Sequence, residues 1–106
     1  MKTLVVDDHQ AARSGLISLF KGTTIEVTET AADGEEALQK LGSGGIDVAL
    51  VDVQMKKMDG LMLLSSIRHT SPELPVVLMS AYDYPVYMAR AVAIGAQDFV
   101  LKSDPI

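Results

Sequence analysis

The sequence contains no cysteine, and this absence excludes several kinds of function together. A disulfide framework, a thiol nucleophile and a zinc–thiolate site all require cysteine, so none of them can occur in this chain. The absence also fits a reducing compartment, where proteins do not depend on disulfides.

Basic residues and long apolar runs are also scarce. Nine lysines and arginines stand against fourteen acidic residues, and the net charge of -5 argues against direct binding to a nucleic-acid backbone. No apolar run is long enough to span a bilayer. The N-terminus reaches the acidic Asp7 too soon for a signal peptide. These features predict a cytoplasmic domain that contacts no membrane and binds DNA only through another domain.

The 106 residues, of which 48% are hydrophobic, are sufficient for one compact domain, and we interpret residues 1–106 as that domain. Short apolar runs predict strands near residues 4–6, 48–51, 76–79 and 99–101, and an alternating run predicts another at 25–29. Apolar residues at helical spacing follow each of the first four strands, in residues 12–20, 37–41, 61–67 and 85–94. Asp33 and Glu36 resemble a capping box at the start of the second of these helices.

This alternation predicts an α/β fold with a doubly wound, five-stranded parallel sheet of the flavodoxin type. The second strand alternates apolar and polar residues, which is typical of an edge strand, and this favours the order 2-1-3-4-5. A fifth helix would complete the alternation, but it is absent from this chain. We therefore expect open apolar surface on one face of the sheet, which would favour dimerisation, swapping or aggregation.

Polar side chains follow four of the predicted strands at the point where each strand ends. Asp7 and Asp8 follow the first strand, Asp52 ends the third, Ser80 follows the fourth and Lys102 follows the fifth. Ligand sites of open parallel sheets form beyond the carboxyl ends of the strands, so we expect these groups to converge.

The convergence of three carboxylates suggests a divalent cation, because neighbouring carboxylates repel one another and burial increases the cost. An all-oxygen ligand set suits Mg²⁺ better than zinc or copper. One carboxylate then remains as a nucleophile, and Asp52 is our candidate because it stands alone at the end of the central strand. Lys102 could neutralise a phosphoryl oxygen and Ser80 could donate a hydrogen bond to another.

Along essentially its whole length, the chain resembles the CheY-like receiver domain of two-component response regulators. The resemblance rests on five motifs in the same order and spacing as in that family: Val6-Asp7-Asp8-His9, Asp52 with Met55, Met58-Asp59-Gly60, Ser80-Ala81, and residues 95–102. It implies a signalling phosphoacceptor, not an enzyme that turns over a free substrate. A sensor histidine kinase would donate the phosphoryl group, and the surface of the fourth helix and fifth strand would change in response.

The resemblance also implies a role for each matching residue. Asp52 would accept the phosphoryl group, and Mg²⁺ would bind to Asp8, Asp52 and the backbone carbonyl of Gln54, with Asp7 acting through water. Ser80 would move toward the phosphoryl group.

Three further residues carry implied roles. Phe99 would swing inward together with Ser80, and Lys102 would bridge to a phosphoryl oxygen. Gln54 and Tyr82 occupy the positions that tune the dephosphorylation rate in this family.

Residues 7–16 resemble receivers that are joined to LuxR-type helix-turn-helix domains, which implies control of transcription by a longer regulator. Two positions depart from the family pattern: Lys56 and Ser103 stand where proline is usual, after Met55 and Lys102. The second departure bears on the placement of Lys102, because a cis bond before a non-proline residue costs about 3 kcal/mol.

Other interpretations remain open at this point. Asp7 and Asp8 could simply cap the first helix, and His9 and His69 are expected to be surface residues rather than ligands. A receiver-like module could also bind partners without phosphorylation. A haloacid-dehalogenase-type phosphohydrolase is disfavoured, because Gln54 stands where that class has its second aspartate.

Overall fold

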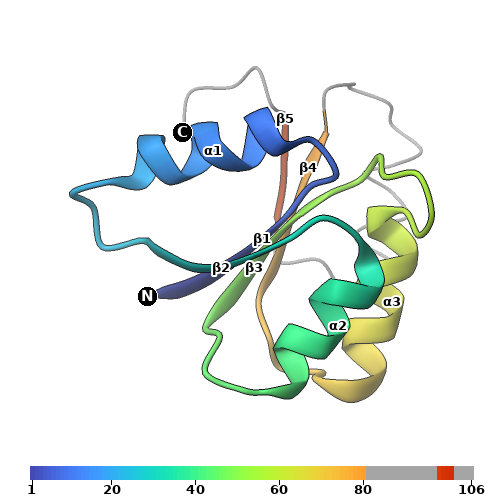
Figure 1. The fold of residues 1–106 in the computed structure, drawn as a ribbon. Helices are drawn as coiled ribbons and strands as arrows, with labels where there is room; N and C mark the ends of the chain where they lie inside the picture. Colours follow the sequence, from blue (N-terminus) through green and yellow to red (C-terminus); the bar gives the residue numbers. More distant parts are fainter. Residues whose placement is uncertain (81–97, 102–106) are drawn as a thin grey trace.

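A parallel sheet of five strands in the order β2-β1-β3-β4-β5 forms the centre of the protein (Figure 1). The computed structural model describes residues 1–80 and the backbone of residues 98–101. The five strands have the following bounds: β1 Lys2–Val6, β2 Glu26–Ala31, β3 Val48–Asp52, β4 Val76–Ser80 and β5 Asp98–Leu101. The predicted flavodoxin-like order, with β2 at one edge, is confirmed.

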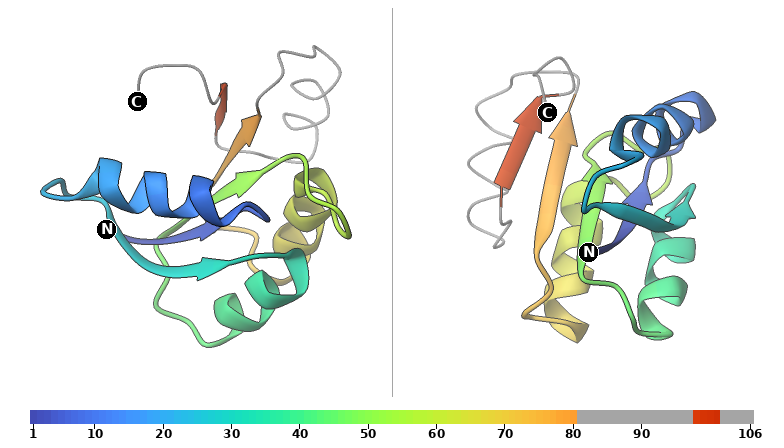
Figure 2. Two further views of the ribbon diagram at one scale, coloured as in Figure 1. Left: turned by 45° about the horizontal axis from the view of Figure 1, so that its top comes forward. Right: turned by 90° about the vertical axis from the view of Figure 1, so that its left-hand side faces the viewer.

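Helices cover both faces of the sheet, as a doubly wound fold requires. Helix α1 (Gln10–Phe20) lies on one face, whereas α2 (Gly34–Gly42) and α3 (Gly60–Thr70) lie side by side on the other (Figures 1 and 2). The helix predicted at residues 85–94 lies outside the described residues. None of the helices in the described part of the chain has the length and apolar character of a membrane span.

The main hydrophobic core lies between the sheet and the helices α2 and α3. Alternate strand residues and one stripe of α3 are fully or almost fully buried there: Leu4, Val6, Ala49, Val51, Val76, Leu78, Leu61, Leu63, Leu64 and Ile67. Alternation along a strand places every second side chain on the same face, which explains why these positions share one core.

The α1 face of the sheet is less completely covered. Leu50 and Val77 point to the face opposite the main core and are only half-buried. Phe20 is the buried residue of α1, whereas Ile17 and Leu19 are 38% and 52% exposed. Val5 and Met79 on this same face are only 0% and 5% exposed, so the expectation of open apolar surface stays a prediction. The more buried side of α1 passes through positions four residues apart and ends at Phe20, so Leu19 lies outside it.

The starts of the helices show which acidic residues act as caps. Asp33 accepts a hydrogen bond from the Glu36 amide at 2.8 Å, which confirms the predicted cap of α2. Asp59 caps α3 in the same way. The alternative that Asp8 caps α1 is wrong: the N-cap is His9, and its side chain makes no capping hydrogen bond.

Loss of the cap at Asp33 should lower the free energy of unfolding. We expect Asp33→Ala to cost about 1 kcal/mol in a urea denaturation experiment, because one amide of the first turn of α2 loses its acceptor. Asp33→Asn keeps an acceptor oxygen and should recover most of that loss. Equal stability of the alanine variant and the wild type would show that the cap contributes nothing.

Candidate functional site

The pairing of β1 with β3 places two aspartates side by side at the carboxyl edge of the sheet. Val6 pairs with Val51, so the residues that follow them, Asp7 and Asp52, occupy neighbouring positions. Both are buried, with 0% and 2% of their surface exposed. The ligand atoms of Asp7, Asp8, His9 and Asp52 all lie within 4.8 Å of one another. The predicted convergence of the three carboxylates is therefore observed.

Backbone contacts hold Asp7 in place. Its amide donates to the carbonyl of Ala31 in the neighbouring strand at 3.1 Å, and the guanidinium of Arg13 donates to its carbonyl at 2.5 Å. Its carboxylate oxygen Oδ1 accepts from the amide of His9 at 2.9 Å. These bonds connect the end of β1 to both β2 and α1, so the first carboxylate of the site has a defined position.

The loop after β3 folds back over Asp52. The amide of Gln54 donates to Asp52 Oδ1 at 3.3 Å, and the amide of Val53 donates to the carbonyl of Met79 in β4 at 2.8 Å. The amide of Gly60, the first residue of α3, donates to the carbonyl of Val53 at 2.8 Å. The end of β3 is thus held between the next strand and the start of the next helix.

The residues at this edge fit a divalent cation. Asp8 Oδ1 is buried and accepts no hydrogen bond within the described residues, while Asp8 Oδ2 accepts one from the amide of Lys56 at 3.3 Å. A buried carboxylate oxygen without a partner is costly, and three carboxylates this close repel one another. A cation among Asp7, Asp8 and Asp52 would remove both costs.

A pocket of about 390 Å³ lies beside this site. Its lining comes from the loop after β1 and the loop after β3: Asp8, His9, Val53, Gln54, Met55, Lys56 and Asp59. Asp8 therefore borders a surface depression at the carboxyl edge of the sheet, and the buried Asp7 and Asp52 lie behind it in the same cluster.

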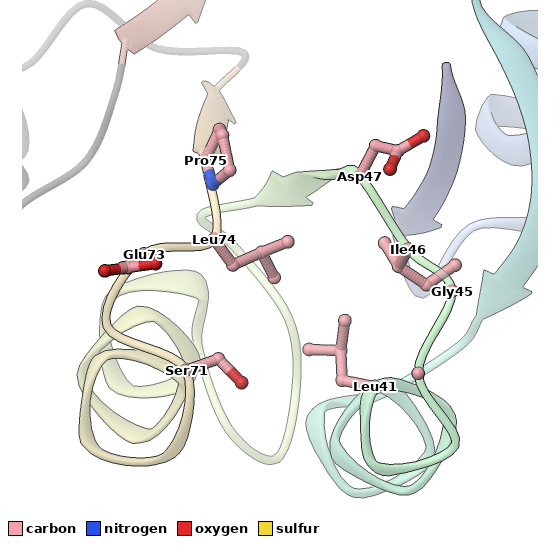
Figure 3. A pocket seen from close by; sticks show the side chains of 9 residues that line it. Leu41, Gly45, Ile46, Asp47, Ser71, Glu73, Leu74 and Pro75 are labelled. Atoms are coloured by element: carbon pink, nitrogen blue, oxygen red, sulfur yellow. The ribbon is translucent and has the colours of Figure 1, made fainter.

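Another pocket lies at the opposite edge of the sheet, between the C-terminal ends of α2 and α3 (Figure 3). Leu41, Ile46, Leu74 and Pro75 give it an apolar lining, with Asp47 at the start of the β3 segment. It is remote from the carboxylate cluster along the strands, and it brings no comparable set of ligands together.

Of the other predicted site residues, the structure describes Ser80 and the backbone of Phe99. Ser80 ends β4, is fully buried, and follows Met79, which pairs with Asp52, so it lies at the same edge of the sheet. Phe99 belongs to β5 by its backbone, but its side chain lies outside the described part. Lys102 and Tyr82 are also outside the described residues.

Two contacts at the site were missed by the sequence interpretation. His9 is a surface residue as predicted, with a side chain 69% exposed, but its Nδ1 lies 2.9 Å from Asp8 Oδ1. The feature of the sequence that could have predicted this contact is the position of His9 directly after Asp7 and Asp8. The amide of Lys56 contacts Asp8, which proline at that position could not do, because proline has no N–H.

Comparisons with known proteins agree with this geometry. The family model described as the response regulator receiver domain matches residues 3–105. The chain is 40% identical over 101 residues to the Regulator of RpoS of Escherichia coli strain K12, covering 93% of this chain and 29% of that protein. It is 34% identical over 107 residues to the oxygen regulatory protein NreC of Staphylococcus haemolyticus, covering 99% and 49%. The chain thus spans less than half the length of these curated relatives.

A solved structure supports the same assignment. The CheX–CheY–BeF3–Mg²⁺ complex from Borrelia burgdorferi contains a chain with a TM-score of 0.92 and 31% identity, covering 99% of this chain and 80% of that one. The fold, the carboxylate cluster and the match over residues 3–105 lead to one conclusion. The chain belongs to the response regulator receiver domain family.

Proposed function

We propose that this domain accepts a phosphoryl group on Asp52 and transmits that event as a signal. The observation that carries the proposal is the burial of Asp52 at the end of the central strand, with its ligand atom within 4.8 Å of those of Asp7 and Asp8. A carboxylate is already deprotonated near neutral pH, so it needs no general base to act as a nucleophile.

The donor in this proposal is a phosphohistidine of a sensor histidine kinase. An oxygen of Asp52 forms the new bond to phosphorus while the bond between phosphorus and the imidazole nitrogen breaks, and the nitrogen keeps the electron pair. The products are an aspartyl phosphate and a free imidazole. Mg²⁺, when bound, neutralises the negative charge that accumulates on the phosphoryl oxygens.

Asp7, Asp8, Asp52 and the backbone carbonyl of Gln54 are the proposed holders of that ion. Asp8 and Asp52 would coordinate directly, and Asp7 would act through water. Asp8 Oδ1, which is buried and accepts no hydrogen bond from the described residues, supports this assignment. The Borrelia complex named above contains Mg²⁺, which agrees with the proposal.

The remaining roles concern the phosphoryl group and the response to it. Ser80 would donate a hydrogen bond to one phosphoryl oxygen, and Lys102 would neutralise another. Phe99 would move with Ser80, and Gln54 and Tyr82 would tune the rate of dephosphorylation. The burial of Ser80 at the same edge as Asp52 supports its part in the proposal.

The output of the switch would be a changed surface around residues 85–101. We propose that the domain belongs to a longer cytoplasmic response regulator whose C-terminal domain, of the LuxR type, binds DNA. The greater length of the curated relatives supports this view. The exposed Ile17 and Leu19 on α1 are compatible with self-association of the receiver.

Phosphoryl uptake can be measured by intact mass. After incubation with acetyl phosphate and Mg²⁺, we expect one phosphoryl adduct, which EDTA prevents, because the carboxylate cluster repels an anionic donor unless a cation is present. Peptide mapping should locate the adduct on Asp52. No adduct on a protein shown to be folded and to bind Mg²⁺ would contradict the proposal and favour a partner-binding module that works without phosphorylation.

A further inference from the structure

We infer that His9 is an additional ligand of the metal site and that it shifts the site's preference toward transition metals. The inference rests on the proposed function in one respect, since it requires a cation among Asp7, Asp8 and Asp52. It goes further by assigning a nitrogen ligand to what is otherwise an all-oxygen site. The observation is that His9 Nδ1 lies 2.9 Å from Asp8 Oδ1 and 3.3 Å from Asp7 Oδ1.

These distances suit two ligands on one octahedral ion. Metal–ligand bonds of about 2.1 Å at right angles place neighbouring ligand atoms about 3.0 Å apart. The Nδ1–Oδ1 separations of 2.9 and 3.3 Å are close to that value. An ion held by Asp8 would therefore find the ring nitrogen of His9 at an adjacent corner without a large movement of either side chain.

An ordinary hydrogen bond between His9 and Asp8 does not account for the closer contact. Asp8 Oδ1 is buried and accepts no hydrogen bond from the described residues, although the ring nitrogen is only 2.9 Å away. The two atoms are thus near each other without the alignment that a hydrogen bond requires. The ring nitrogen instead shares a hydrogen bond with Asp7 Oδ1 at 3.3 Å, and a cation between Nδ1 and Asp8 Oδ1 would give the Asp8 oxygen a partner.

The backbone around His9 is already fixed. The amide of His9 donates to Asp7 Oδ1 at 2.9 Å, so the residue is anchored to the same carboxylate that its ring approaches. The ring itself is 69% exposed, so an ion can reach it through the pocket beside the site. The ring nitrogen is also held by its hydrogen bond with Asp7 Oδ1 at 3.3 Å, so the ring already faces the carboxylates.

A nitrogen ligand changes which ions the site prefers. Carboxylate and carbonyl oxygens suit Mg²⁺, whereas imidazole favours Zn²⁺, Ni²⁺ and related ions, and affinity rises along the series from Mn²⁺ to Cu²⁺. Mg²⁺ usually keeps several waters and gains little from an imidazole. The His9 ring should therefore strengthen the binding of Co²⁺ and leave the binding of Mg²⁺ almost unchanged.

The test measures the affinities of the full chain and of two variants for Co²⁺ and for Mg²⁺ by calorimetric titration. The buffer is mildly alkaline, so that free imidazole is neutral. His9→Ala removes the ring, and its loss costs α1 little because the side chain makes no capping hydrogen bond. His69→Ala is the matched control, since His69 is also an exposed histidine but lies near the end of α3. Thermal unfolding of each variant checks that it is folded.

We expect His9→Ala to bind Co²⁺ about tenfold more weakly and Mg²⁺ within about twofold of the wild type. The visible spectrum of bound Co²⁺ should also change, because a nitrogen ligand is lost. His69→Ala should match the wild type in both titrations.

Three other outcomes would overturn the inference. Unchanged Co²⁺ binding by His9→Ala, with Mg²⁺ binding intact, would remove His9 as a ligand and leave the proposed function standing. If His9→Ala lost the same factor of affinity for Co²⁺ and for Mg²⁺, the ring would support the site structurally and would not be a selective ligand. Failure of the wild type to bind either ion would reject the metal site itself, and with it the Mg²⁺ requirement of the proposed function.

Discussion

Asp52→Asn should take up no measurable phosphoryl group from acetyl phosphate. We expect the rate to fall by more than about 1,000-fold, because an amide oxygen is a far weaker nucleophile than a carboxylate oxygen. The substitution changes the volume of the buried side chain very little, so the fold should remain. Intact mass after incubation with acetyl phosphate and Mg²⁺ measures the effect.

The matched control is Asp47→Asn, at the opposite end of the β3 segment (Figure 3). Asp47 Oδ2 accepts a hydrogen bond from the amide of Lys2 at 2.7 Å, and asparagine retains an acceptor there. We expect its phosphoryl uptake to match the wild type. Uptake by Asp52→Asn at the wild-type rate would place the modification on another residue and reject Asp52 as the nucleophile.

Gly60→Ala should strongly destabilise the protein. A Cβ at this position would lie 2.3 Å from the carbonyl oxygen of Asp52 and 2.8 Å from the Cα of Val53. These are backbone atoms, and hydrogen bonds from Val53 to Met79 and from Gly60 to Val53 hold them in place. Relief of the clash must separate α3 from the end of β3, and we expect a loss of about 3 kcal/mol in urea denaturation.

Gly15→Ala provides the contrast, because it adds the same methyl group to another helix. Nothing lies within 4 Å of the corresponding Cβ, and Gly15 is inside α1. Alanine is the better helix former, so this variant should gain about 0.5–1 kcal/mol. Equal stability of Gly60→Ala and the wild type would mean that the approach of α3 to Asp52 is looser than the structure indicates.

The Gly60 substitution also bears on the site. Because the clash is with the main chain of Asp52, any relief of it moves the proposed nucleophile. Phosphoryl uptake by Gly60→Ala should therefore fall under conditions in which the variant is still folded. Gly15→Ala should leave uptake at the wild-type level.

Much of the fold follows from local patterns in the chain. Short apolar runs ending in Asp7, Asp52 and Ser80 predicted buried strands, because a strand covered by helices must be apolar along its length. The alternating run near Val27 predicted the edge strand, since one side of an edge strand meets water. The spacing of Asp33 and Glu36 predicted the start of α2, because a cap depends only on residues within one helical turn.

The site was predictable to the extent that it depends on strand ends. In a parallel sheet all carboxyl ends lie at one edge, so topology alone brings Asp7, Asp8 and Asp52 together. This explains why the carboxylate cluster was predicted correctly. The two strands that supply it, β1 and β3, are separated in the sequence by α1, β2 and α2.

By itself, the sequence determined the class of fold, the strand order and the set of carboxylates, because periodicity and strand ends are local properties. Only the tertiary structure decided which atoms meet. The approach of His9 to Asp8 depends on the direction of the chain as it enters α1, and the contact of the Lys56 amide with Asp8 joins two loops far apart in sequence. The requirement for glycine at position 60 arises from the packing of α3 against Asp52. Such contacts depend on distances between separate elements, and no pattern within one segment contains that information.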